Sequence, residues 1–200
     1  MQFLRKINRD VLLYILSDSF YYAGYGVLNA FLSLLVTVQI THRVDMAGYV
    51  IAYYMIIRSL AELPCAGLVK RWSFRRRQYT VLACYLIYGC SIMLMGFSVT
   101  ILQILILQTV NALADALAYP IRWPIFTRIM DEGNEEVEWS TEDVLSTAFP
   151  ALFTILAGVL AQQYGVRATF LLFGPLLILA GIIFMFIKVP EVTSPQSLTP

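Results

Sequence analysis

The chain has 200 residues, of which 59% are hydrophobic and only 14% are charged, and its mean hydropathy is +0.72. A soluble domain carries about a quarter charged residues, so this sequence lacks the polar side chains that a water-exposed surface requires. The formal charge of +1 averages a basic segment and an acidic one, and it therefore indicates neither nucleic-acid binding nor an acidic substrate.

Six apolar segments are each long enough to cross a bilayer, which takes roughly 20 mostly apolar residues per helix. In chain order they lie at about 11–37, 46–69, 78–98, 100–122, 143–164 and 167–188. The connections are too short to fold independently, so residues 1–190 are expected to form one all-α transmembrane domain. The Pro, Ser and Thr of residues 191–200 are typical of a disordered tail.

Lysine and arginine alternate between the two ends of these segments in a way that predicts orientation. Arg5, Lys6 and Arg9 precede the first segment, and five more cations stand in the second connection: Lys70, Arg71, Arg75, Arg76 and Arg77. The opposite side has only Arg43 and Arg167. The positive-inside rule therefore predicts that both termini are cytoplasmic.

The fourth connection is acidic, with the sequence MDEGNEEVEWSTED. We interpret residues 131–143 as a loop, and Ser140 followed by Asp143 fits a capping box that opens the fifth helix. Two roles stay open for this loop. It is either a solvated, capped connection or a docking site for a basic partner segment.

Five charged residues fall inside the predicted spans: Asp18, Arg58, Glu62, Asp115 and Arg122. A charge at the centre of a membrane helix costs roughly 3 kcal/mol on insertion scales, so each is a functional-site hypothesis. Arg58 and Glu62 are four residues apart, and a simple ion pair that holds helices together would also explain them. Asp18 and Asp115 have no opposite charge at that spacing. Each needs a partner on another helix, a bound cation or a proton.

Helical periodicity places these charges on polar stripes. The stripes comprise Asp18, Tyr22, Tyr25 and Asn29 in the first segment, Tyr54, Arg58 and Glu62 in the second, and Gln108, Asn111, Asp115 and Arg122 in the fourth. Lipid cannot satisfy the hydrogen bonds of such stripes, so they face a bundle interior or a water-filled cavity. The sequence therefore predicts a polar centre that binds substrate or ions.

Residue types for other chemistry are scarce. Cys65, Cys84 and Cys90 show neither a CxxC motif nor metal-ligand spacing, and the single histidine, His42, lies in a predicted loop. The sequence has no nucleotide-binding loop and no serine, histidine or metal constellation. We therefore expect no cofactor, no metal and no enzymatic activity.

The connection GLVKRWSFRRR, from Gly67 to Arg77, resembles the signature loop of the major facilitator superfamily. The family pattern is a glycine, an acid four residues later, a second glycine at seven, and basic residues at eight and nine. Gly67, Arg75 and Arg76 match this pattern, whereas Arg71 stands in the place of the acid and Phe74 in that of the second glycine.

A second partial copy follows 91 residues later, where Gly158, Gly165 and Arg167 occupy the offsets of zero, seven and nine. The resemblance implies two three-helix inverted repeats, as in one half of a twelve-helix major facilitator transporter, with both loops acting in gating. In that family the first helix of each unit lines the substrate path. The resemblance thus assigns the segments of Asp18 and Asp115 to the cavity.

The function implied by the resemblance is secondary transport, coupled to ions or protons, or facilitated transport of a small solute. Two copies of the chain would associate in the lipid bilayer to restore twelve helices. Asp18 and Asp115 would hold a cation or proton, with Arg58 and Arg122 balancing them or holding an anionic group. Tyrosines with Asn29 and Asn111 would orient the small-molecule substrate; no nucleic acid is involved. Two alternatives stay open: a non-transporting scaffold or regulatory subunit, and a truncated twelve-helix protein.

Overall fold

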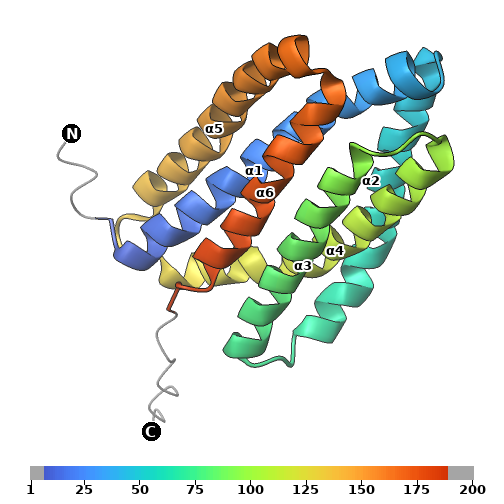
Figure 1. The fold of residues 1–200 in the computed structure, drawn as a ribbon. Coiled ribbons are helices and arrows are strands. Elements are labelled where there is room, and N and C mark those ends of the chain that lie inside the picture. The colour runs from blue at the N-terminus through green and yellow to red at the C-terminus, as the bar shows by residue number, and fades with distance from the viewer. Residues whose placement is uncertain (1–6, 189–200) are drawn as a thin grey trace, which may run out of the picture.

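The computed structural model describes residues 7–188, and within this range it consists of helices and short connections without a strand (Figure 1). The helices are α1 (Arg9–Leu34), which continues as the π-helical turn η2 (Leu35–Ile40), α2 (Val44–Val69), α3 (Phe74–Met95), α4 (Ile101–Ile129), α5 (Glu135–Tyr164) and α6 (Val166–Phe184). Six helices, counting η2 with α1, are long and apolar enough to cross a membrane. The predicted all-α fold of six spans is confirmed.

The helices form an arch in the order α5, α1, α6, α3, α4, α2, in which each packs mainly on its neighbours. If α1 is exchanged with α4, α2 with α5 and α3 with α6, the same order results, now starting from the other end. Each first helix packs on the second and third helices of the other unit, and α3 packs on α6. The symmetry supports the proposal of two related three-helix units.

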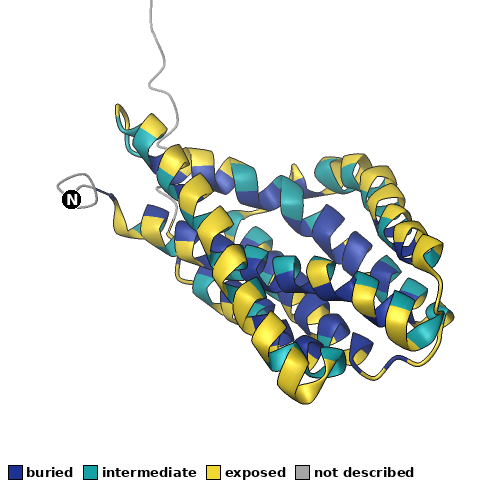
Figure 2. Ribbon diagram, turned by 90° about the horizontal axis from the view of Figure 1, so that it is seen from above, coloured by how far each residue is buried: buried dark blue, intermediate teal, exposed yellow. Residues whose placement is uncertain are grey.

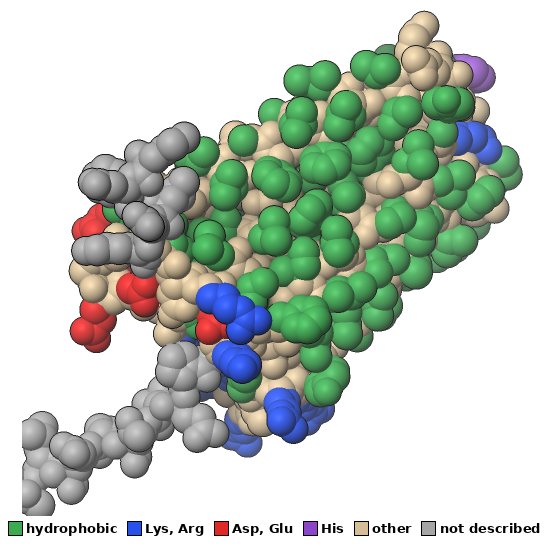
Figure 3. Space-filling view, turned by 60° about the vertical axis from the view of Figure 1, so that its left-hand side comes forward, with side chains coloured by type: hydrophobic (Ala, Val, Ile, Leu, Met, Phe, Trp, Pro, Cys, Tyr) green, Lys and Arg blue, Asp and Glu red, His purple; other side chains and the backbone are tan. Residues whose placement is uncertain are grey.

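The two ends of the arch are the least covered helices. Within its most apolar window, α2 has 17% of its residues buried and α5 only 6%, against 39–50% for the other four helices. Figure 2 shows this as exposed residues along the outer helices around a buried centre. Hydrophobic side chains cover most of the lateral surface in Figure 3, as lipid contact requires.

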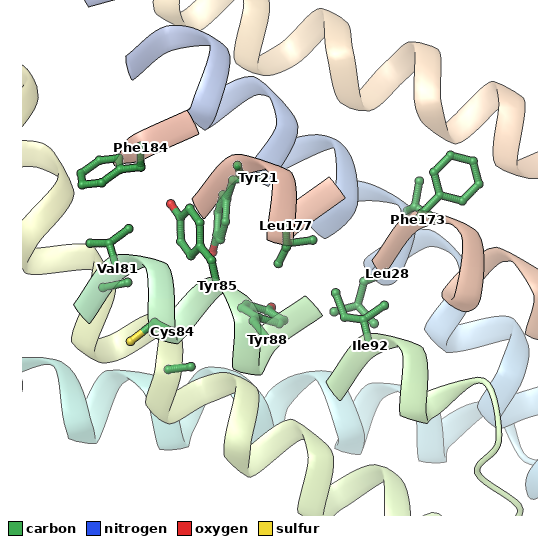
Figure 4. Packing of buried hydrophobic residues seen from close by; sticks show 14 of the residues in the cluster. Tyr21, Leu28, Val81, Cys84, Tyr85, Tyr88, Ile92, Phe173, Leu177 and Phe184 are labelled. Atoms are coloured by element: carbon green, nitrogen blue, oxygen red, sulfur yellow. The ribbon is translucent and has the colours of Figure 1, made fainter. Parts of the chain in front are cut away.

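The inner helices α3 and α6 approach each other most closely at a pair of glycines. A Cβ atom added to Gly89 would lie 2.8 Å from the carbonyl oxygen of Gly174, and one added to Gly174 would lie 2.9 Å from that of Gly89. Small residues at such crossings let membrane helices pack backbone to backbone. On the side of this crossing toward the start of α3, larger side chains such as Tyr85 and Leu177 fill the core (Figure 4).

The acidic connection differs from the prediction, because α5 begins at Glu135 and most of residues 131–143 are helical. Ser140 lies inside the helix and donates its hydroxyl to the carbonyl of Glu136 at 2.6 Å, so the predicted capping box at Ser140 is wrong. The early start has a tertiary cause. Buried Glu138 accepts the backbone N–H of Asp131 at 3.1 Å, and Trp139 stacks on Trp123 with ring centroids 5.1 Å apart.

The fourth helix also extends past its predicted end. It runs seven residues beyond Arg122 to Ile129 despite Pro120 and Pro124, because neighbouring helices let a membrane helix tolerate proline. A capping box does occur in the structure, at the start of α4, where Thr100 and Gln103 exchange hydrogen bonds. The predicted tail at 191–200 lies outside the described residues.

Candidate functional site

The deepest charged contact joins α1 to α4. Asp18 of α1 and Arg122 of α4 are 2% and 1% exposed and form an ion pair through Asp18 Oδ1 and Arg122 Nη2. Arg122 reaches this depth because α4 continues to Ile129, which puts it about 10 Å from the helix end at 1.5 Å per residue. Of the three options that the sequence left open for Asp18, the structure therefore shows a partner on another helix.

A second charged contact joins α2 to α4. Asp115 of α4 accepts hydrogen bonds from the hydroxyls of Tyr21 at 2.7 Å and Tyr54 at 2.9 Å. Its Oδ2 also lies 2.7 Å from Nε of Arg58, which in turn pairs with Glu62 at 3.7 Å. The side chains of Arg58 and Glu62 are 28% and 34% exposed, whereas that of Asp115 is 4% exposed. This contact is therefore open on one side.

Glu142 of α5 is a third acid at the first contact, and it is 4% exposed. Its side chain lies beside that of Asp18. Asp18 Oδ2 and Glu142 Oε1 are both buried and receive no hydrogen bond from a donor among residues 7–188. Ionised carboxylates only accept hydrogen bonds, so a bond between these two groups requires a proton on one of them.

The charged residues thus form two clusters of similar composition. The buried cluster is Asp18, Glu142 and Arg122, and the open cluster is Asp115, Glu62 and Arg58. Each contains two carboxyl groups and one guanidinium, so each carries a formal charge of −1 with all groups ionised.

Tyr21 connects the two clusters. Its hydroxyl donates to Asp115, and its ring lies under the guanidinium of Arg122, 4.3 Å from centroid to Cζ, a cation–π contact. The ring also stacks on Tyr85 of α3, with centroids 5.0 Å apart (Figure 4). Because α1 and α4 have few backbone contacts, these long side chains fill the space between them.

The remaining predicted binding residues surround this centre at varying distances. Tyr22 is half-buried, 5.7 Å from the Arg122 guanidinium, and Tyr25 stacks on Tyr21 at 6.1 Å. Asn111 is fully buried and donates its amide to Gln108 at 3.4 Å. Asn29 is half-buried eleven residues along α1 from Asp18, about 16 Å away at helical rise. The structure does not bring Asn29 to the clusters.

Sequence reasoning missed three members of the network. Tyr21 follows Asp18 by three residues, a spacing that shares a helix face, and this signal was available. Tyr88 of α3 lies with its hydroxyl 3.4 Å from that of Tyr54, but its predicted span, 78–98, contains no charged residue to draw attention to it. Glu142 was hidden in the acidic run interpreted as a loop.

The residues of the two signature-like loops lie at opposite ends of the bundle. Gly67, Arg75 and Arg76 are exposed around the α2–α3 connection, where the Arg76 guanidinium lies 4.2 Å from the Trp72 ring centroid. Their role in gating stays a prediction.

At the other end, Gly158 is exposed on α5. Gly165 separates α5 from α6 with φ of +85°, a conformation that favours glycine. Arg167 donates from Nε to the side chain of Gln39 at 2.9 Å, which ties α6 to η2.

Among residues 7–188, six helices long and apolar enough to span a membrane surround buried charges, which defines an integral membrane protein. The sequence profile of the Major Facilitator Superfamily matches residues 15–199. Because this match covers most of the chain, the protein belongs to that superfamily, and it is a multi-pass membrane transporter of the major facilitator type. No curated protein matches the chain. Among residues 7–188, no three His, Cys, Asp or Glu side chains gather as metal ligands.

Proposed function

We propose that this protein is a secondary transporter that couples the movement of a small solute to protons, with the buried cluster as the proton site. The observation that carries the proposal is the excess of acid there: Asp18 and Glu142 share one guanidinium, that of Arg122. In a low-dielectric interior two adjacent carboxylates cannot both ionise without a large cost. The pair therefore holds one proton between its two members.

The open cluster is proposed as the solute contact. Arg58 and Glu62 are only partly covered, and the Arg58 guanidinium lies 4.8 Å from the Tyr119 ring centroid. Charged side chains at this depth face water or protein, not lipid. Arg58 would balance Asp115 or bind an anionic group of the solute, while tyrosines and Asn111 orient it.

Coupling between the two clusters runs through Tyr21. Release of the shared proton adds a negative charge beside Arg122 and strengthens the attraction of Arg122 to Asp18 and Glu142. Because the Arg122 guanidinium lies on the Tyr21 ring, its displacement shifts the tyrosine whose hydroxyl bonds Asp115. Proton loss would thereby change the partners available to Arg58 and the solute.

A second copy of the chain is proposed to close the open side. The half-buried polar residues on α1, α2 and α4 need water or another protein surface as hydrogen-bond partners. The helices α2 and α5 are the least buried ones. Two chains inserted in the same orientation can associate around an axis normal to the membrane and expose the central site alternately. Native mass spectrometry of the protein in lipid should find a dimer. A protein that is strictly monomeric and inactive in liposomes would overturn the dimer.

The transport proposal is tested in liposomes that enclose a pH-sensitive dye, to which mixtures of small solutes are added from outside. Wild-type protein should change the internal pH when a transported solute enters. Glu142→Gln and Asp18→Asn should abolish proton movement at unchanged expression. Glu136→Gln, an exposed glutamate on the same helix, is the matched control and should retain it.

The outcomes separate the competing functions. Solute flux that depends on Asp18 but moves no protons would replace proton coupling with facilitated or cation-coupled transport. No effect of either substitution on any flux would favour a scaffold or regulatory subunit. Arg71, which stands where the family's loop acid belongs, is the observation in favour of that second candidate.

A further inference from the structure

A cavity outside the charged centre lies where α3 begins and α6 ends. Its volume is about 760 Å³, within the range of small-molecule sites. Three of the lining residues are cationic and three aromatic; the lining is Arg9, Phe74, Arg75, Gln78, Tyr79, Met185, Phe186, Ile187 and Lys188. Figure 3 shows Lys and Arg side chains gathered at one end of the bundle, next to the hydrophobic lateral surface.

Hydrogen bonds hold the walls of this cavity together. Gln78 of α3 is 7% exposed and donates its amide to the carbonyl of Ile187 at 2.7 Å. Asp10 at the start of α1 accepts the backbone N–H of Lys188 at 3.0 Å. These bonds fix the segment after α6 against α1 and α3, so the cavity is a defined feature of the fold.

The only acid described beside the cations of this cavity, Asp10, bonds the backbone of Lys188 and not a cationic side chain. Arg9, Arg75 and Lys188 form no ion pair with any residue in the described range 7–188. The first turn of α3 has no acid, and it carries Arg75, Arg76 and Arg77, although the positive end of a helix dipole disfavours cations. A bound anion at this position would offset both effects.

Apolar groups border the cationic ones. Tyr79 is 60% exposed and Phe186 is 58% exposed, and both line the cavity. A ligand that satisfies both surfaces has an anionic head and an apolar tail. A soluble phosphate would use only the cations.

We propose that this cavity binds the headgroup of an anionic phospholipid from the leaflet at the basic end of the bundle. The phosphate contacts Arg9, Arg75 and Lys188, and the acyl chains lie along Tyr79 and Phe186. The bound lipid bridges α1, α3 and α6. This site is independent of proton coupling and of the dimer.

The test measures lipid retained by the purified protein, by native mass spectrometry, after equilibration with phosphatidylglycerol and phosphatidylcholine. Wild-type protein should retain phosphatidylglycerol preferentially. The triple variant Arg9→Gln, Arg75→Gln, Lys188→Gln should lose about a hundredfold in this preference, because each cation that contacts the bound phosphate contributes about fivefold.

The matched control is Lys70→Gln, Arg71→Gln, Arg128→Gln, which removes three cations from the same end of the bundle but none from the cavity. This control should keep the preference within about fivefold. If it loses as much as the cavity variant, or if neither loses any, the proposed site is wrong. Displacement of the lipid by inorganic phosphate alone would also overturn it, in favour of a soluble anion.

Folding is checked by thermal unfolding of each variant in phosphatidylcholine. If the triple variant unfolds there, the three single variants replace it. Each is expected to lose about fivefold in the preference, and single variants that keep the full wild-type preference contradict the proposal.

Discussion

The buried and open clusters have the same composition, two acids and one arginine, but opposite surroundings. Asp18 and Arg122 are almost fully covered by protein, and Glu142 is 4% exposed. Only Asp115 is covered in the other cluster, while Arg58 and Glu62 are partly open. We therefore propose that a proton offsets the excess acid in the buried cluster, whereas solvent, solute or a second subunit can offset it in the open one.

Removal of the arginine from each cluster tests this difference most strongly. Arg122→Gln leaves two carboxyl groups facing each other without a cation, and breaking a buried pair from one side costs about 3–5 kcal/mol. Arg58→Gln should cost several times less, because Arg58 is itself partly exposed. In that variant Asp115 also keeps the hydrogen bonds from Tyr21 and Tyr54. The measurement is the free energy of unfolding of both variants in the same detergent. Equal losses would remove the distinction between the clusters.

Tyr21 allows the link between the clusters to be cut in two steps. Tyr21→Phe removes the hydroxyl that bonds Asp115 and should cost about 1–2 kcal/mol, because a buried acceptor loses a partner. Tyr21→Leu also removes the ring under Arg122. Two double-mutant cycles separate these contributions. Arg122→Gln combined with Tyr21→Leu should show a coupling free energy, whereas Arg122→Gln combined with Tyr21→Phe should show almost none. Additive effects in both cycles would mean that Tyr21 does not connect the clusters.

Glu62→Gln should have the smallest effect on stability. Its ion pair with Arg58 is 3.7 Å long and about a third of the side chain is exposed, so the loss should be a few tenths of a kcal/mol, as for exposed pairs four residues apart on a helix. The measurement is the free energy of unfolding of Glu62→Gln, compared with that of Arg122→Gln under the same conditions. A loss as large as that of Arg122→Gln would mean that the open cluster is closed in the native protein, as a tight second subunit would make it.

The sequence predicted the membrane class because helix length and apolar composition are set locally. It also predicted that Asp18 and Asp115 each need a partner on another helix, a bound cation or a proton, and the structure places Arg122 and Arg58 beside them. The pairing itself could not be predicted, because it depends on α4 continuing through Pro120 and Pro124 to place Arg122 at the depth of Asp18.

The start of α5 was misjudged for a similar reason. Local acid content favoured a loop, whereas burial of Glu138 and stacking of Trp139 on Trp123 are tertiary contacts. With that helix start wrong, Glu142 remained outside the predicted site. Tyr21 could have been included in the predicted site from the sequence, because its spacing of three residues from Asp18 places both on the same helix face.

The central claim is that Asp18 and Glu142 hold one proton between them. Infrared difference spectroscopy of the membrane-reconstituted protein detects the carbonyl stretch of a protonated carboxyl group without any substrate. At neutral pH the wild-type protein should show such a band. Glu142→Gln should remove it and Glu136→Gln should leave it unchanged. A wild-type spectrum without this band, or a band that survives Glu142→Gln unaltered, would contradict the account.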